Sequence, residues 1–493
     1  MAVVIALDAG TTGVRAFAVD ETGAPCGWAY REFTQYFPRP GWVEHDPLEI
    51  WQAVQATIAE LMATLNQPVA AVGVTNQRET LVCWNRRTGD PLARAIVWQD
   101  RRTAPFCQRL EQAGHLGLVR QRTGLVLDAY FSASKAAWWF NEGAVAIDGN
   151  LALGTVDSWL VWNLTGGRAD AGAQHVTDPS NASRTLLFDI REGAWSAELA
   201  ELFGVPLHTL AEVLPSSGRF GLTAPGTSAL GAGVPISGIA GDQQAALFGQ
   251  ACFEVGMTKN TYGTGSFVLM NVGTVCPPPT EGLLTTVAWT LANGETSYAL
   301  EGAIFVTGAA IQWLRDGLGI IGAAAETGPL AASVASTDGV YLVPAFVGLG
   351  SPYWDPDARG TLVGLTRGTG RAHLARAAVE AMAYQTRDVV EAMQAASGRT
   401  VAALRADGGA AVMDLLLQLQ ADQLGVPVTR PAITETTALG AAYLAGLAEG
   451  VWSSLAELAT CWRAERVFEP SGDAVERQTG YAGWQRAVAR SRG

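Results

Sequence analysis

Residues 3–19 read VVIALDAGTTGVRAFAV, two apolar runs joined by the turn Asp8-Ala9-Gly10-Thr11-Thr12-Gly13. Residues 257–270, MTKNTYGTGSFVLM, repeat this order of strand-like run, Gly/Thr turn and apolar run. Apolar runs bounded by such turns predict β-hairpins. Two similar hairpins, about 250 residues apart, predict two domains of related topology. The alternative is coincidence, because Gly/Thr hairpins are common.

Outward from the hairpins, helical and strand-like patterns are mixed, which predicts an α/β protein. The clearest expected elements are helices at 48–65, 305–318, 371–396 and 412–424, and strands at 69–75, 81–84 and ending at 407. The second hairpin begins the second domain, so we place the boundary near 248–256. We therefore expect domains at residues 1–250 and 251–493, with a ligand site between them.

The composition argues for a globular protein and against several other classes. Of the 493 residues 48% are hydrophobic and 16% charged, and the net charge of -13 opposes binding to nucleic acid. No apolar stretch reaches the ~18 residues that cross a bilayer, and no basic leader opens the sequence, so we expect a cytoplasmic protein. The six cysteines form no CxxC pair, which indicates neither a disulfide framework nor a zinc site.

Three glycine-rich turns at expected strand ends are candidates for binding a nucleotide. A Walker-type loop requires a Gly-Lys dipeptide, which this sequence lacks. The amides and hydroxyls of the first turn can instead bind phosphate oxygens, Asp8 can hold Mg²⁺ through water, and Arg15 can add a charged contact. Gly263-Thr264-Gly265 would supply a second phosphate turn, and Asp407-Gly408-Gly409 would admit a base or ribose close to the backbone. Each turn alone is weak evidence.

A second group of polar residues suits a hydroxylated phosphoryl acceptor. Asp242 follows an apolar run, as a general base at an exposed strand end would, although it could equally cap a helix that begins at Gln243. Arg78 and Glu79 pair a donor with an acceptor beside one another, which suits vicinal hydroxyls but also an ordinary solvated turn. The aromatic residues beside polar motifs, which could pack on a small carbon skeleton or simply fill the core, are Trp98, Tyr130 and Phe267.

Read together, these motifs resemble the FGGY family of carbohydrate kinases over nearly the whole chain. The most specific stretches are PGWVEHDP (40–47), TNQRET (75–80), AIVWQ (95–99), GIAGDQQAALFGQ (238–250), KNTYGTG (259–265), WDP (354–356), GLTRG (364–368) and TALGAAY (437–443). The resemblance implies two ribonuclease H-like domains of the actin-like ATPase fold, with the catalytic cleft between them. Among family members the similarity is greatest to those that phosphorylate glycerol with ATP and Mg²⁺.

The resemblance also implies a role for individual residues. Asp242 would be the general base, and Asp8 and Asp242 would hold the metal. The acceptor would be bound by Arg78, Glu79, Trp98, Tyr130, Asp242, Gln243 and Phe267. ATP would be bound by Thr11, Thr12, Gly13, Arg15, Thr264, Gly308, Gln312, Gly409 and Met413. The product would be sn-glycerol 3-phosphate, formed by in-line transfer.

One position departs from the family pattern. Where these relatives usually carry Asn, four residues after the second glycine of the adenosine motif, this chain has Met413. We therefore expect weaker ATP binding or a relaxed nucleotide preference. Two alternatives to glycerol phosphorylation stay open: a family kinase for a pentulose or larger polyol, and an actin-like ATPase with no acceptor. Relatives also imply a homodimer or homotetramer.

Overall fold

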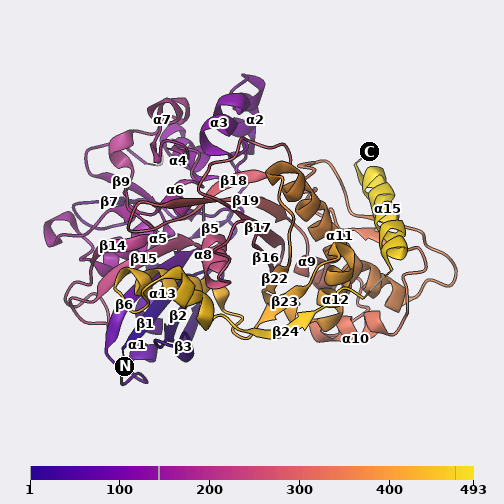
Figure 1. The fold of residues 1–493 in the computed structure, drawn as a ribbon. Helices are drawn as coiled ribbons and strands as arrows, with labels where there is room; N and C mark the ends of the chain where they lie inside the picture. The colour runs from indigo at the N-terminus through magenta and orange to yellow at the C-terminus, as the bar shows by residue number, and fades with distance from the viewer. Residues whose placement is uncertain (1, 143–144, 472, 493) are drawn as a thin grey trace.

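A computed structural model describes residues 2–142, 145–471 and 473–492. In Figure 1 the first of its two large mixed sheets lies on the left, and the second crosses the middle with helices to its right. The first sheet has the order β14-β15-β6-β1-β2-β3. Its strands are β1 (Val3–Ala9), β2 (Gly13–Val19), β3 (Pro25–Glu32), β6 (Val69–Asn76), β14 (Ser217–Leu222) and β15 (Pro235–Gly241). β1 pairs antiparallel with β2, and β1, β6 and β15 run parallel to one another.

The second sheet repeats this plan and has the order β18-β19-β17-β16-β22-β23-β24. Its strands are β16 (Thr258–Tyr262), β17 (Ser266–Gly273), β18 (Leu284–Thr290), β19 (Thr296–Ile304), β22 (Leu404–Asp407), β23 (Val428–Pro431) and β24 (Ala464–Phe468). β16 pairs antiparallel with β17 and parallel with β22. Both hairpins predicted from the sequence are therefore confirmed, and each lies beside a parallel third strand.

Smaller elements complete the first half of the chain. A five-stranded sheet contains β4 (Gln35–Tyr36), β5 (Glu44–His45), β8 (Ala95–Ile96), β7 (Leu81–Asn85) and β9 (Leu151–Thr155). The helices are α1 (Pro47–Met62), α2 (Ala104–Gln112), α3 (Leu116–Thr123), α4 (Ser132–Asn141), α5 (Val156–Leu164), α6 (Pro179–Ala182), α7 (Ala197–Phe203) and α8 (Asp242–Gly249). The Asp46 side chain caps α1 by accepting a hydrogen bond from the Leu48 amide, as expected of an N-cap aspartate.

The helices of the second half lie mainly around the second sheet. They are α9 (Gly308–Gln312), α10 (Thr327–Ala332), α11 (Arg371–Ser397), α12 (Asp414–Leu424), α13 (Thr436–Ala448), α14 (Leu455–Cys461) and α15 (Ala474–Ser491). The helix predicted at 48–65 ends at Met62, and two others begin later than expected. The 305–318 helix begins at Gly308, because Thr307 and Gly308 donate backbone hydrogen bonds to the 263–264 turn, and the 412–424 helix begins at Asp414, after a 3₁₀ turn at Gly409–Val412.

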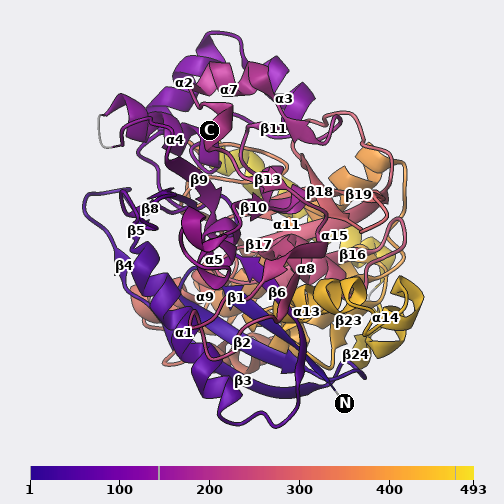
Figure 2. The same ribbon diagram turned by 90° about the vertical axis from the view of Figure 1, so that its left-hand side faces the viewer.

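Helix α13 instead packs on one face of the first sheet, against β1, β6 and β15 (Figure 1, and turned by 90° in Figure 2). It shares an apolar core with α8 and the first-sheet residues Val4, Ala6 and Ala71. The backbones approach closely: a Cβ on Gly440 would lie 1.8 Å from the Ala245 carbonyl oxygen. A late segment thus covers the first sheet, and the division at residues 250 and 251 stays a prediction.

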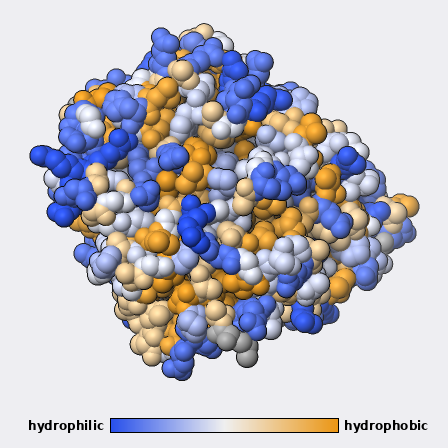
Figure 3. Space-filling model, turned by 60° about the vertical axis from the view of Figure 1, so that its left-hand side comes forward, coloured by the Kyte–Doolittle hydropathy of each residue, from blue (hydrophilic) through white to orange (hydrophobic). Residues whose placement is uncertain are grey.

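On the face in Figure 3, hydrophilic and hydrophobic residues are interspersed. Within the described residues, no helix is both long and apolar enough to cross a membrane.

Candidate active site

Three parallel strands of the first sheet end together and bring the predicted acceptor residues to one edge. Asp8 of β1 is in register with Thr75 of β6, and Gly241 of β15 with Asn76. The loop after β6 carries Arg78 and Glu79, and α8 begins with Asp242 immediately after β15. The carboxyl ends of parallel strands are where α/β proteins commonly bind ligands.

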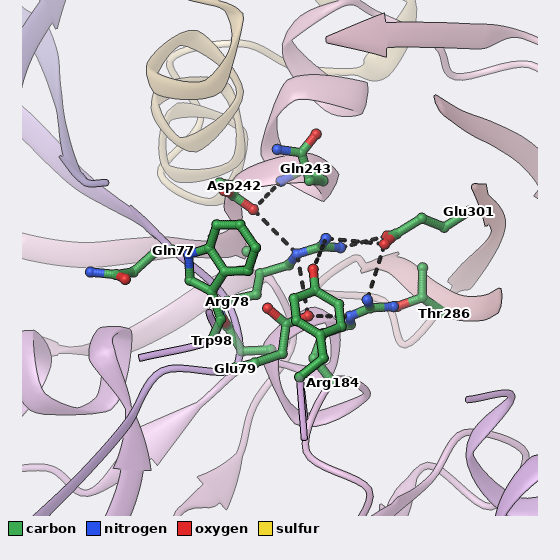
Figure 4. Close-up of polar contacts among 12 residues, drawn as sticks. Gln77, Arg78, Glu79, Trp98, Arg184, Asp242, Gln243, Thr286 and Glu301 are labelled. Carbon is green, nitrogen blue, oxygen red and sulfur yellow. Dashed lines mark hydrogen bonds and ion pairs between the residues drawn. The ribbon is translucent and has the colours of Figure 1, made fainter. Parts of the chain in front are cut away.

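Arg78 is buried at the centre of this edge, with its guanidinium nitrogens directed at several acceptors (Figure 4). Its Nη1 donates to Glu301 Oε2 at 2.5 Å, and its Nη2 donates to Glu301 Oε1 at 3.1 Å and to the Tyr130 hydroxyl at 3.3 Å. Its Nε lies 3.2 Å from Asp242 Oδ1. The guanidinium therefore links the predicted base to an acid that belongs to the second sheet.

Glu79 is buried and adopts a left-handed backbone conformation, with φ of 62°. Its Oε1 accepts a hydrogen bond from Arg184 Nε at 2.7 Å. Burial raises the pKa of Glu79, and the positive charges of Arg78 and Arg184 oppose that rise. A non-glycine residue in this conformation is strained. Ion pairs with Arg78 and Arg184 hold the carboxylate in place.

Asp242 is the first residue of α8, and Gly241, not Asp242, is the residue that caps the helix. The carboxylate still accepts a hydrogen bond from the Gln243 amide at 2.7 Å. Burial raises its pKa, whereas Arg78 and Lys259 lower it. Lys259 of β16 reaches the same helix, since its Nζ donates to Gln243 Oε1 at 2.6 Å. A buried lysine in the second half of the chain therefore contacts a residue in the first half that is predicted to bind the phosphoryl acceptor.

The three predicted aromatic residues lie around this network. The rings of Trp98 and Tyr130 meet edge to face with centroids 5.7 Å apart, and Arg78 lies 5.7 Å from the Phe267 ring centroid. Lys135 donates to the carbonyl oxygens of residues 129, 130 and 131, which fixes the segment carrying Tyr130. Apolar walls and directed polar groups are therefore combined, as in sites for small polar molecules.

The first phosphate turn connects β1 to β2 on the same edge. Its backbone is closed by a hydrogen bond from the Gly10 amide to the Gly13 carbonyl at 2.9 Å. Thr12 Oγ1 lies 3.4 Å from the Tyr30 hydroxyl. Close packing explains the glycine at position 13, because a Cβ added there would lie 2.5 Å from the Arg31 carbonyl oxygen of β3. The Arg15 guanidinium forms an ion pair with Glu435, so this predicted ATP contact already has an acidic partner.

The second phosphate turn and the predicted adenosine residues gather at the matching edge of the second sheet. Thr261 of β16 is in register with Asp407 of β22, so both turns begin side by side. The first turn of α9 donates to the Thr264 carbonyl oxygen, and a Cβ on Gly308 would lie 2.6 Å from the Gly263 carbonyl oxygen. Gln312 ends the same short helix. The second hairpin and α9 thus form one compact backbone surface.

Gly409 and Met413 stand at the two ends of the turn that follows β22. Around Gly409 a Cβ would meet nothing within 4 Å, whereas the Met413 side chain packs against the apolar core of the second half. Gly409 therefore leaves open space beside the backbone, and Met413 fills space with an apolar side chain at the position where the family pattern has asparagine.

Comparisons with known proteins agree with this arrangement. Models for the FGGY family of carbohydrate kinases match residues 3–249 with the N-terminal domain and residues 258–449 with the C-terminal domain. The chain belongs to the FGGY family of carbohydrate kinases. It is 57% identical over 495 residues to the glycerol kinase of Dechloromonas aromatica (strain RCB), covering 99% of this chain and 97% of that protein. The glycerol kinase of Carboxydothermus hydrogenoformans is 56% identical, covering 99% and 98%.

A solved structure of an FGGY relative matches just as completely. The crystal structure of Plasmodium falciparum glycerol kinase with ADP superposes with a TM-score of 0.93 at 33% identity, covering 100% of this chain and 98% of that one. The predicted fold class, α/β with the two-domain FGGY architecture, is confirmed.

Two charged FGGY site neighbours, Arg184 and Glu301, were not predicted from the sequence. Both side chains are fully buried, and Arg184 Nη2 donates to Glu301 Oε1 at 3.0 Å. Together Arg78 and Arg184 hold the pKa of Glu301 at about 2, although burial alone would raise it. The available signal was an acid inside the apolar run YALEGAIF, residues 298–305, because an unpaired carboxylate is costly to bury.

Magnesium and ATP suit the residues on this FGGY edge. Burial raises the pKa of Asp8 to about 7, Arg15 lowers it and the nearby Asp242 raises it further. Two neighbouring carboxylates that oppose each other's ionisation are stabilised by a cation. The described residues contain no cluster of three or more His, Cys, Asp or Glu side chains able to hold a metal. The pair Asp8 and Asp242 fits Mg²⁺, which commonly takes one or two carboxylates and completes its shell with water and phosphates.

Proposed function

We propose that this chain transfers the γ-phosphoryl group of ATP to a primary hydroxyl of glycerol, giving sn-glycerol 3-phosphate. The observation that carries the proposal is the convergence of Arg78, Glu79 and Asp242 beside the Asp8 turn. A base, a donor–acceptor pair and a phosphate turn then share one edge of a sheet. The two glycerol kinases with more than half of their residues identical to this chain support the same assignment.

In the proposed reaction, Asp242 accepts the proton of the attacking hydroxyl. Its partly exposed carboxylate and its position at the start of α8 leave one face open to a substrate. Arg78 and Glu79 hold the other hydroxyls, and Trp98 and Phe267 pack on the carbon chain. When bound with the nucleotide, Mg²⁺ supplies positive charge that offsets the charge on the phosphates. Positioning and charge stabilisation provide most of the acceleration in such transfers.

We infer a short acceptor from the contacts that surround Arg78. The terminal nitrogens of Arg78 donate to Glu301 and Tyr130, which fixes the direction in which the guanidinium faces the site. The edge-to-face pair of Trp98 and Tyr130 closes another side. A pentulose or larger polyol would need extra room and extra polar partners, which is the basis for ranking glycerol first.

The test is ADP formation with MgATP and, in turn, glycerol, dihydroxyacetone, erythritol, xylulose and ribulose. We expect glycerol to give the highest kcat/KM and Asp242→Ala to lower kcat about 10²- to 10⁴-fold, the usual cost of losing a general base. A higher kcat/KM for a five-carbon sugar would refute glycerol as the substrate, but the assignment as a kinase would stand. ADP release without any acceptor, unchanged in Asp242→Ala, would favour an actin-like ATPase instead.

A cytoplasmic location and assembly into a homodimer or homotetramer are part of the proposal. Fractionation of the producing cells and light scattering of the purified protein would test them.

A further inference from the structure

The wall of the acceptor site is bonded directly to the phosphate turn. The indole Nε1 of Trp98 donates a hydrogen bond of 2.9 Å to Thr11 Oγ1. Trp98 follows β8 in the first half of the chain, and Thr11 is the residue between Gly10 and Thr12 in the turn after β1. Trp98, which is predicted to bind the phosphoryl acceptor, therefore contacts Thr11, which is predicted to bind ATP.

The chemistry of this bond fixes the role of the threonine hydroxyl. An indole nitrogen can only donate, so Thr11 Oγ1 must be the acceptor. The single hydroxyl proton of Thr11 is not used in that bond and is left to donate elsewhere. Thr11 is half-buried at the turn, where a phosphate oxygen is the expected acceptor. Trp98 thus orients a hydroxyl donor before the nucleotide arrives.

A second contact between the same two regions supports this coupling. Gln77, next to Arg78, donates its backbone amide to the Ala9 carbonyl oxygen at 2.8 Å and its side-chain amide to the Gly10 carbonyl oxygen at 3.1 Å. In Figure 4 the Gln77 side chain extends away from the Arg78 guanidinium, on the far side of Trp98. Thr80 joins the pair, since its Oγ1 accepts from the Trp98 amide and donates to Gln77 Oε1.

We propose that Trp98 is a positioning residue for the nucleotide as well as a wall of the acceptor site, and that its bond to Thr11 couples acceptor binding to nucleotide binding. The inference rests on the proposed function for the identity of the two substrates. An acceptor that packs on the indole ring restricts its motion and so restricts the Thr11 hydroxyl. By thermodynamic reciprocity each substrate then tightens the binding of the other.

A double-mutant cycle tests the bond. Binding of a non-hydrolysable MgATP analogue is measured by calorimetry, with and without glycerol, for wild type, Trp98→Phe, Thr11→Val and the double variant. Phenylalanine keeps an aromatic wall but removes the N–H donor. We expect Trp98→Phe to weaken analogue binding about 3- to 10-fold, the usual range for one hydrogen bond, and to have little further effect once Thr11 is Val. Equal losses in both backgrounds, or no loss in either, would overturn the proposal.

Thr11→Ser keeps the hydroxyl and serves as the matched control for Thr11→Val. In wild type and Thr11→Ser, glycerol should tighten the analogue at least about fivefold, the lower end of typical coupling, and in Thr11→Val this factor should fall toward one. The comparison does not depend on Trp98→Phe folding, and a factor unchanged in Thr11→Val would also refute the coupling. If wild type lacks glycerol-dependent ADP formation, the proposed function fails, whereas the cycle without glycerol still reports on the Trp98–Thr11 bond.

Discussion

At the scale of single residues, the site depends on charged side chains that are buried and form ion pairs with one another. Arg78 and Arg184 face Glu79, Glu301 and Asp242, and four of these five side chains are almost wholly buried. A buried ion pair adds little net stability, but removal of one partner leaves an uncompensated charge. The network is therefore a device for holding Arg78 and Glu79 in one geometry.

Replacement of Glu301 by glutamine removes the shared anion of both arginines. We expect Glu301→Gln to lower the unfolding free energy by about 3 to 5 kcal/mol, the usual effect of breaking a buried pair, and to raise the KM for glycerol because Arg78 is released. Chemical denaturation and steady-state kinetics measure the two effects. Glu295→Gln, an exposed acid on the turn before β19, is the control and should change neither. A Glu301→Gln protein with the wild-type KM would show that Arg78 needs no such support.

Met413 is the residue-scale departure that bears on the nucleotide. A side-chain amide at this position would restore a hydrogen-bonding group beside the Gly409 turn, so we expect Met413→Asn to lower the KM for ATP. Kinetics at saturating glycerol measure this, with Met413→Leu as the apolar control. An unchanged KM for ATP in the asparagine variant would reject the proposed nucleotide contact.

The residues that could be predicted from sequence share one property: each belongs to a local motif beside a turn. Asp8 and Asp242 follow apolar runs directly, and Arg78 follows one after a short polar segment, so their place at a sheet edge could be expected. Glu301 and Arg184 are in the site only because distant segments pack together, and no local pattern connects residue 184 with residue 301. Tertiary packing, not local preference, selected them.

At the scale of elements, two helices of the second half are joined by a buried acid. Asp388 of α11 accepts hydrogen bonds from the Tyr481 hydroxyl at 2.6 Å and the Trp484 indole at 2.8 Å, both on α15. Burial raises the pKa of Asp388 to about 6, and these donors oppose the rise. The carboxyl group therefore titrates well above its ordinary range while it anchors α15.

This raised pKa predicts a pH dependence with a definite sign. Between the unfolded pKa of about 4 and the folded value of about 6, the folded state retains a proton that the unfolded state has lost, so stability falls as pH rises through this window. We expect wild type to lose up to about 3 kcal/mol relative to Asp388→Asn between pH 4 and pH 7, since each pKa unit is worth ~1.4 kcal/mol. Urea unfolding of both proteins across this range is the measurement. Parallel stability curves would contradict the assignment.

The crossing of α8 and α13 depends on glycine. The built Cβ of Gly440 would lie 1.8 Å from a backbone oxygen of α8, and that of Gly249 2.0 Å from the Thr436 carbonyl oxygen of α13. Close helix contact of this kind leaves no space for a methyl group, so the two helices must separate if one is added.

Gly440→Ala should therefore lower the thermal midpoint by several degrees, as expected from overpacking of about 1 to 3 kcal/mol or more. Gly117 of α3 is the matched control, because its Cβ would meet nothing within 4 Å. Gly117→Ala should be neutral or slightly stabilising, since alanine favours helix. Differential scanning calorimetry compares the two, and equal midpoints would mean that the helices adjust at little cost.

At the scale of the whole molecule, the two sheets are related in plan but not independent in packing. The pairing of strands within each half could be predicted from the repeated hairpin and its glycine-rich turn. The position of α13 could not be predicted, because the sequence of an Ala- and Gly-rich helix does not indicate which sheet the helix will pack on. This interlock, in which α13 from the second half of the chain packs on the first sheet, is visible only in the three-dimensional structure.

This interlock predicts the behaviour of a fragment. Residues 1–250 alone lack the helix that covers α8 and one face of β1, β6 and β15. We expect this fragment to bind a hydrophobic dye and to lack a cooperative thermal transition. The same fragment joined through a Gly/Ser linker to residues 433–461 should regain the transition. A cooperatively folded 1–250 fragment would show that α13 is dispensable for the first core.

The late position of α13 also has a consequence during synthesis. At ~5–20 residues per second, the ribosome needs roughly 10 to 40 seconds to pass from residue 250 to residue 436. Throughout that interval the nascent first half carries an uncovered apolar face in a crowded cell, so we expect its yield to depend on molecular chaperones that shield this face until translation is nearly finished.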